Sequence, residues 1–285
     1  MDREKQAAEN GAPPAATPSG DPLEILLASA GMRGGALTVR DDLYDEAMLL
    51  DAVRIYRGRG RRFRLVDSGR LDRFRLEWLL EAGADLYTSD EFRTDLDEIE
   101  GLLQASGKGR SILAYFVRGP FPEVGADGEP AANPLLRLGR AGAYLHVSNR
   151  EQKRSPEVQL ALAAECEAGG SHLVIYHHGP FGPEMTELAG ANLWLHLDER
   201  SLADSDARDF FLDMLKSRGS RARFVLYSEG GSEALWLKEV FAAGAYVRFQ
   251  RKQFDYRSPY KSLEQAASRK KLPHTAYFLH PTFLL

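Results

Sequence analysis

The tripeptide Ala-Gly-Ala recurs along this sequence and constrains its fold more than any other feature. Copies occur at 82–84, 141–143, 189–191 and 243–245, and residues 168–170 (Ala-Gly-Gly) form a degenerate fifth copy. Each copy follows a stretch of helical periodicity and precedes an apolar run of strand length. There the glycine can take the left-handed conformation that ends a helix, and the small alanines let the helix end pack closely on a sheet. The repeat therefore predicts helix-to-strand junctions.

Apolar runs of strand length alternate with these helical stretches. Such runs lie at 36–40, 63–67, 85–89, 111–117, 143–148, 172–178, 192–198, 223–228 and 245–249. Strict alternation predicts an α/β fold with parallel strands and crossover helices. The architecture resembles a (β/α)8 barrel of the TIM type, with one strand candidate in excess, and counting from 36–40 is favoured. A doubly wound open parallel sheet is the alternative, because one sequence does not give the strand order.

Composition divides the chain into three parts. Residues 1–21 are charged and rich in alanine and proline, which predicts a disordered tail. Residues 22–250 form the predicted barrel domain. Residues 251–285 carry seven basic and two acidic residues and then become apolar and aromatic. We expect this extension to pack on the barrel, with its basic residues either binding phosphate or an anionic surface or forming a solvated face.

Charge, hydropathy and cysteine content exclude several classes of protein. A net charge of -4 and a pI near 6.0 argue against a dedicated nucleic-acid binder. No run approaches the roughly 18 apolar residues that span a membrane, and the N-terminus lacks the apolar core of a signal peptide. The single cysteine, Cys166, permits no internal disulfide and favours a reducing compartment. We therefore expect a cytoplasmic protein that acts on a small molecule, and a homo-oligomer is left open.

Strand phase predicts which polar side chains face the barrel interior. On each strand one parity is aliphatic and should face the helices, so the other parity should point inward. This argument places His177 toward the helices and His178 inward. The predicted inward set is His146, Tyr176, His178, His196, Asp198, Glu229 and Arg248. Asp67 and Arg118 cannot be placed by phase but end strands, and barrel active sites lie at that rim.

Imidazoles and carboxylates at convergent strand ends are typical ligands of a divalent transition metal. We predict His178, His196 and Asp198 as ligands of Zn, Mn or Fe, whose bound water would become a nucleophile. Catalytic roles are predicted for Glu229, as fourth ligand or general base, and for His146 and Asp67. Arg118 and Tyr176 are predicted to bind substrate. This set favours a metal-assisted hydrolase or lyase, although strand histidines also serve as core residues and acids at strand ends as helix caps.

A second hypothesis uses the same rim for phosphate. Gly230, Gly231 and Ser232 follow a strand and open a helix, where backbone N–H groups favour an anion, and Arg248 could add a charged contact. This pattern predicts an isomerase or aldolase of a phosphorylated compound. The third hypothesis is a non-catalytic barrel used for binding or as a scaffold. The HExxH, GxSxG, P-loop and GxGxxG motifs do not occur, so no nucleotide cofactor motif is present.

Overall fold

The computed structural model describes residues 36–119, 134–217, 220–250 and 254–278. All nine predicted strand runs form strands of one sheet, and every pair of neighbours is parallel. The strands are β1 (Leu37–Arg40), β2 (Phe63–Val66), β3 (Ala84–Ser89), β4 (Leu113–Val117), β5 (Tyr144–Ser148), β6 (Leu173–Tyr176), β7 (Leu193–Asp198), β8 (Arg223–Ser228) and β9 (Tyr246–Phe249). The predicted α/β fold is therefore confirmed.

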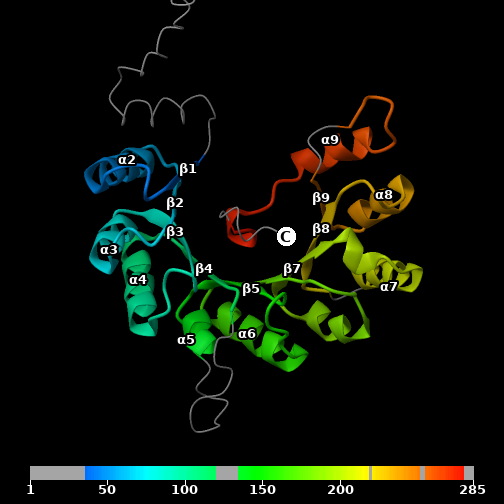
Figure 1. Cartoon of the computed structure of the whole chain (residues 1–285), viewed down its shortest axis with the longest axis horizontal. Coiled ribbons are helices and arrows are strands. Elements are labelled where there is room, and N and C mark those ends of the chain that lie inside the picture. Colours follow the sequence, from blue (N-terminus) through cyan, green and yellow to red (C-terminus); the bar gives the residue numbers. More distant parts are fainter. Residues whose placement is uncertain (1–35, 120–133, 218–219, 251–253, 279–285) are drawn as a thin grey trace, which may run out of the picture.

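The described α-helices are α2 (Glu46–Gly58), α3 (Arg73–Glu81), α4 (Leu96–Gly109), α5 (Pro134–Arg140), α6 (Pro156–Ala168), α7 (Ser205–Lys216), α8 (Ala234–Ala242) and α9 (Lys261–Arg269), and the 3₁₀ helices are η2 (Pro183–Gly190), η3 (Glu199–Leu202) and η4 (His274–Ala276). The helices that connect successive strands line the outside of a curved sheet, whereas α9 and η4 follow the last strand (Figure 1). None of the described helices is both long and apolar enough to span a bilayer.

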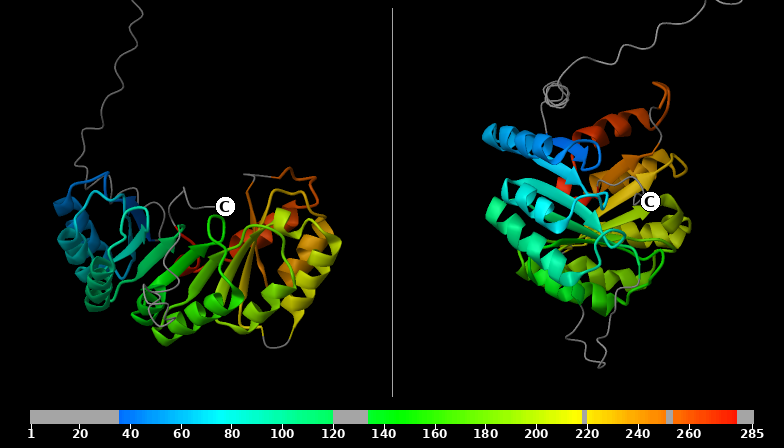
Figure 2. Two further views of the ribbon diagram at one scale, coloured as in Figure 1. Left: turned by 60° about the horizontal axis from the view of Figure 1, so that its bottom comes forward. Right: turned by 60° about the vertical axis from the view of Figure 1, so that its left-hand side comes forward.

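The strand order is sequential from β1 to β9, which excludes the doubly wound alternative. It also corrects the strand count, because neither 36–40 nor 245–249 is surplus and the sheet contains both. In the described part of the chain no ladder pairs β9 with β1, so the sheet does not close as an eight-stranded barrel would. Instead, α9 packs on β9, and the segment after it enters the hollow of the curved sheet (Figures 1 and 2).

The Ala-Gly-Ala repeat does mark the junctions. Gly83, Gly142 and Gly244 have φ values of 105°, 100° and 110°, in the region that favours glycine. The fourth copy differs, because Gly190 ends the 3₁₀ helix η2 and is not among the glycines with positive φ. A 3₁₀ helix winds more tightly than the α-helices that end at the other copies, so the same tripeptide takes another conformation there.

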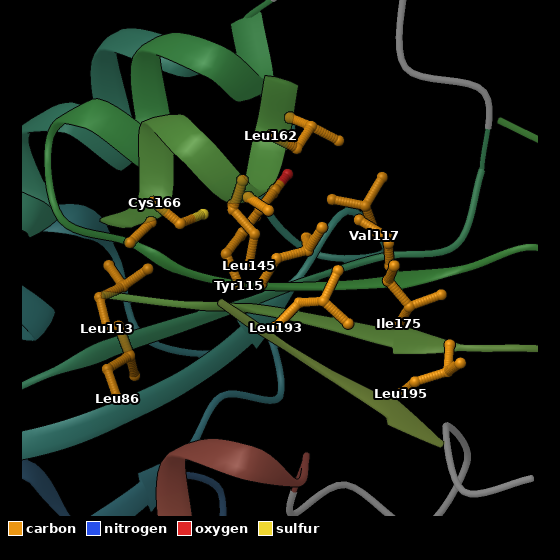
Figure 3. Close-up of a cluster of buried hydrophobic side chains, with 14 of the residues drawn as sticks. Leu86, Leu113, Tyr115, Val117, Leu145, Leu162, Cys166, Ile175, Leu193 and Leu195 are labelled. Atoms are coloured by element: carbon orange, nitrogen blue, oxygen red, sulfur yellow. The ribbon is translucent and has the colours of Figure 1, made fainter. Parts of the chain in front are cut away.

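The two faces of the sheet have different cores. The outer face packs aliphatic side chains such as Leu86, Leu145 and Leu195 against the helices (Figure 3). Cys166 of α6 belongs to this layer, and burial raises the pKa of its thiol to about 12. The concave face is aromatic, and its buried members are Tyr87, Ala114, Phe116, Val174, Tyr176, Trp194, Val225, Ala276 and Phe278. The phase argument is thus confirmed for the strands on which it relied.

Candidate ligand-binding site

The chain's own C-terminal segment, residues 270–278, occupies much of the concave face. The hydroxyl of Tyr87 donates to the carbonyl of His274 (3.0 Å), and His172 Nε2 donates to the carbonyl of Thr275 (2.9 Å). The backbone N–H of Phe278 donates to the hydroxyl of Tyr176 (2.8 Å), and Phe278 is 1% exposed. Tyr176, predicted to bind substrate, therefore holds this segment. Together with Tyr87 and His172, it satisfies backbone groups of the inserted segment.

Two of the predicted inward histidines are buried in this core. His146 Nδ1 lies 3.1 Å from the Tyr176 hydroxyl, and His196 Nδ1 lies 3.0 Å from that of Tyr227. Burial lowers the pKa of His196 to about 3 and that of His146 well below its usual value, so both imidazoles are neutral at pH 7. Each side chain is 0% exposed. A substrate could therefore reach His146 only if the C-terminal segment moved.

The three predicted metal ligands do not converge. The Asp198 carboxylate accepts from the backbone N–H groups of Arg200 (2.8 Å) and Ser201 (3.1 Å) and pairs with the Arg200 guanidinium, so it caps η3. His196 lies in the buried aromatic core. His178 lies outside that core, where its backbone N–H donates to the side-chain oxygen of Asn149. Within the described ranges, no three His, Cys, Asp or Glu side chains are arranged to hold a metal ion. The proposed ligand set is not assembled in this geometry.

The predicted phosphate loop already binds an anionic group. The carboxylate of Glu199 accepts from the backbone N–H groups of Glu229 (2.9 Å), Gly231 (3.2 Å) and Ser232 (3.2 Å) and from the hydroxyl of Ser228 (2.6 Å). Burial raises the pKa of Glu199, but these hydrogen bonds outweigh it, and the net pKa lies below its ordinary value. The backbone N–H groups of this loop therefore donate to a carboxylate of the protein itself.

Asp67 and Arg118, at the ends of β2 and β4, have partners of their own. Asp67 is 1% exposed and accepts from Arg93 (2.9 and 3.1 Å) and from the Thr88 hydroxyl (2.6 Å). The exposed Arg118 pairs with Glu151 at 2.6 Å. Asp67 therefore neutralises the buried Arg93, and Arg118 lies on the surface.

A rim cavity of about 320 Å³ lies at the carboxyl ends of β7, β8 and β9. Four predicted site residues, Asp198, Glu229, Gly231 and Ser232, line it together. Glu229 is exposed there, beside the loop that Glu199 fills. The sequence therefore located this cavity, although the side chains in it do not form the predicted metal centre.

A second, larger cavity adjoins the first, because Tyr227 and Gln250 line both. Its volume is about 630 Å³, within the range of small-molecule sites. We call it the basic cavity, and its described lining is Arg64, Tyr227, Arg248, Phe249, Gln250, Ser268, Lys271, Leu272 and Tyr277. It lies between β2 on one side of the curved sheet, β8 and β9 on the other, and the C-terminal segment.

The described lining of the basic cavity holds three cations and no acid. Arg248 donates to the carbonyls of Ala267 (3.0 Å) and Lys270 (2.8 Å), which carry no net charge, and burial lowers the pKa of its guanidinium. The Nε of Arg64 is buried without a hydrogen-bond partner. No described carboxylate lies within ion-pair distance of Arg64, Arg248 or Lys271. Arg64 and Arg248 are half-buried and Lys271 is exposed, so the two guanidinium groups are partly removed from water without an acidic partner in the described lining, which favours binding of an anion.

Sequence reasoning predicted Arg248 but missed Arg64, Lys271 and Tyr277. A signal existed for Arg64, because its neighbours Phe63 and Leu65 face the helices, so Arg64 must face inward. The basic and then aromatic C-terminal composition suggested an anion site, but nothing local placed that segment opposite β2.

Comparison with known proteins adds little to this description. No family model and no curated protein matches the chain. Among solved structures, one similar chain is a truncated form of 3-deoxy-D-arabino-heptulosonate 7-phosphate synthase from Thermotoga maritima, with 16% identity, a TM-score of 0.33, and coverage of 82% of this chain and 85% of that one. This likeness is too distant to carry function. The fold and the cavities define the class: an α/β protein of nine parallel strands with a cavity on its concave face whose described lining holds three cations and no acid.

Proposed function

We propose that this protein binds a small molecule carrying a phosphate or carboxylate group in the basic cavity. The observation that carries the proposal is the set of three cations, Arg64, Arg248 and Lys271, without an acidic partner in the described lining. A guanidinium stays protonated in proteins, so its partial burial leaves a charge that water cannot fully solvate. An anionic ligand would supply the missing partner through charge-assisted hydrogen bonds.

The adjoining rim cavity supports an enzymatic role. Tyr227 and Gln250 are shared, so a ligand held by its anion in the basic cavity could extend past them toward Glu229. An exposed carboxylate beside a bound substrate can act as a general base. The activity that this arrangement favours is isomerase or aldolase chemistry on a small anionic compound, with Glu229 as the base. The Gly230–Ser232 loop is assigned to Glu199 in this proposal and not to the ligand.

Binding of simple anions tests the proposal. Isothermal titration of the full chain with inorganic phosphate and with acetate should show saturable binding to at least one, weakened by added salt. Arg64→Met should reduce that affinity by about tenfold or more, because a charge-assisted hydrogen bond contributes roughly 1.5–3 kcal/mol. Arg54→Met removes an exposed arginine on α2 and should leave the affinity unchanged. Equal binding by both variants would contradict the proposed site.

The metal-assisted hydrolase or lyase remains a separate hypothesis, which the observed positions of His178, His196 and Asp198 do not favour. Metal analysis of protein purified without chelator would test it directly. A stoichiometric metal that is lost in Asp198→Asn would revive it. The non-catalytic binding or scaffold role predicts anion binding without turnover, so Glu229→Gln would then change no measurable reaction.

A further inference from the structure

We infer that the ligand of the basic cavity is an aromatic anion: a planar apolar ring carrying a phosphate or carboxylate. This inference rests on the proposed function and names the class of ligand. The lining contains more than cations, since Tyr227, Phe249, Leu272 and Tyr277 also face the cavity. Three of these four side chains are aromatic, and they come from β8, β9 and the C-terminal segment.

Cavity size supports an organic ligand over a simple ion. A water molecule occupies about 30 Å³ of liquid, so a cavity of about 630 Å³ is far larger than a phosphate with its five non-hydrogen atoms. If only an inorganic anion bound, most of the apolar side chains that line the cavity would remain in contact with water. A ring beside the anionic group would remove that apolar lining from water, and aromatic side chains pack well against planar rings.

The aromatic wall is held in place by the fold. Tyr227 is fixed by the hydrogen bond between its hydroxyl and His196 Nδ1. Phe249 contacts the rings of Phe254 (5.0 Å between centroids) and Tyr260 (6.3 Å). Tyr277 lies directly before Phe278, which is anchored to Tyr176 by its backbone N–H. These constraints reduce the entropy lost when a planar ligand enters, because the side chains that contact it are already ordered.

Tyr277 is the side chain through which the inference can be tested with least damage. It is half-buried, it lines the cavity, and the anchoring hydrogen bonds of the segment are made by its neighbours and by strand side chains. Truncating it should remove part of the ring's contact surface and leave the three cations unchanged. The ratio of affinities for an aromatic and a non-aromatic anion therefore isolates the ring's contribution.

The experiment compares matched probes on the full chain by isothermal titration. Phenyl phosphate should bind at least tenfold more tightly than methyl phosphate, or benzoate than acetate, and the better pair identifies the anionic group. Tyr277→Ala should lower that ratio about threefold or more with little change in the methyl phosphate or acetate affinity. Tyr256→Ala, at a side chain 86% exposed, is the control and should keep the ratio.

The outcomes separate this inference from the proposed function. If simple anions bind and the aromatic probes bind no more tightly, the inference is overturned and the anion site stands. If none of the four probes binds, the proposed function fails as well. A preference for aromatic probes that persists unchanged in Tyr277→Ala would place the ring elsewhere and overturn the inference.

Discussion

Arg93, in the loop after β3, and Arg248, on β9, show how differently one fold can accommodate two arginines. Arg93 has a side chain 8% exposed and pairs with the carboxylates of Asp67 and Glu98, each at 2.9 Å. Burial opposes its charge, but these partners outweigh burial and raise its pKa. Arg248 is also partly buried, yet its hydrogen-bond acceptors are neutral carbonyls, and burial lowers its pKa. The first arginine has its counter-charge within the fold, whereas no described carboxylate pairs with the second.

The glycine loop, residues 229–232, is the opposite case, because its polar groups have a charged partner within the chain. There the fold supplies backbone donors suited to an anion, and Glu199 satisfies them. The loop resembles a ligand site by its motif, but its hydrogen-bond donors already have a partner in the chain. The basic cavity carries no recognisable motif, but its cations have no acidic partner in the described lining. Whether a polar group has a partner within the chain distinguishes a structural element from a binding site more reliably than its residue type does.

The largest expected effect is the loss of a buried partner. Asp67→Asn should lower the free energy of unfolding by about 3 kcal/mol, because it leaves Arg93 buried with Glu98 as its sole carboxylate. Urea unfolding measures this loss, with Asp97→Asn on the exposed first turn of α4 as control. The double variant Asp67→Leu with Arg93→Met should recover part of the loss. A loss below about 1 kcal/mol would show that the pair does not stabilise the fold.

A smaller effect is expected at the glycine loop, and it should depend on pH. Glu199→Gln should cost about 1–2 kcal/mol at pH 7, since Glu199 is only half-buried and its charge is partly screened. The folded pKa of Glu199 is depressed, so its contribution is present above the unfolded pKa of about 4.3 and is lost as pH falls through the lower folded value. Urea unfolding at pH 7 and pH 3 should show the difference shrinking, and the exposed Glu187→Gln should show none. Equal costs at both pH values would contradict the assignment.

The smallest expected change in stability is at the unpaired cation. Arg64→Met should alter the free energy of unfolding by less than about 0.5 kcal/mol, or raise it, because no described ion pair is lost. Arg62, two residues away, is the matched contrast: it donates to the 1% exposed Asp85 at 3.0 and 2.9 Å, so Arg62→Met should destabilise clearly. Thermal unfolding in phosphate-free buffer compares them. A larger loss of stability in Arg64→Met than in Arg62→Met would contradict the claim that Arg64 lacks a stabilising partner, on which the anion site rests.

The candidate site could be predicted only in part. The carboxyl-end rim and its residues Asp198, Glu229, Gly231 and Ser232 were found from strand phase and loop position, and they do line one cavity. Their roles could not be read, because Asp198 and Glu229 lie next to partners such as Arg200 and Glu199 whose positions depend on how η3 packs. His146 and His196 were placed correctly on the inner face, but their burial depends on a segment far along the chain, and His178 lies outside that core.

The sequence by itself determined the repeating α/β architecture, the nine strands and the face toward which most strand side chains point. These follow from local rules: periodicity, glycine at helix ends and the alternation of strand side chains. Only the tertiary structure decided that the sheet stays open between β9 and β1, that residues 270–278 enter its concave face, and that Arg64 lies opposite Arg248. The physical reason is distance along the chain, because partners nearly 200 residues apart, such as Tyr87 and His274, leave no periodic mark on either segment.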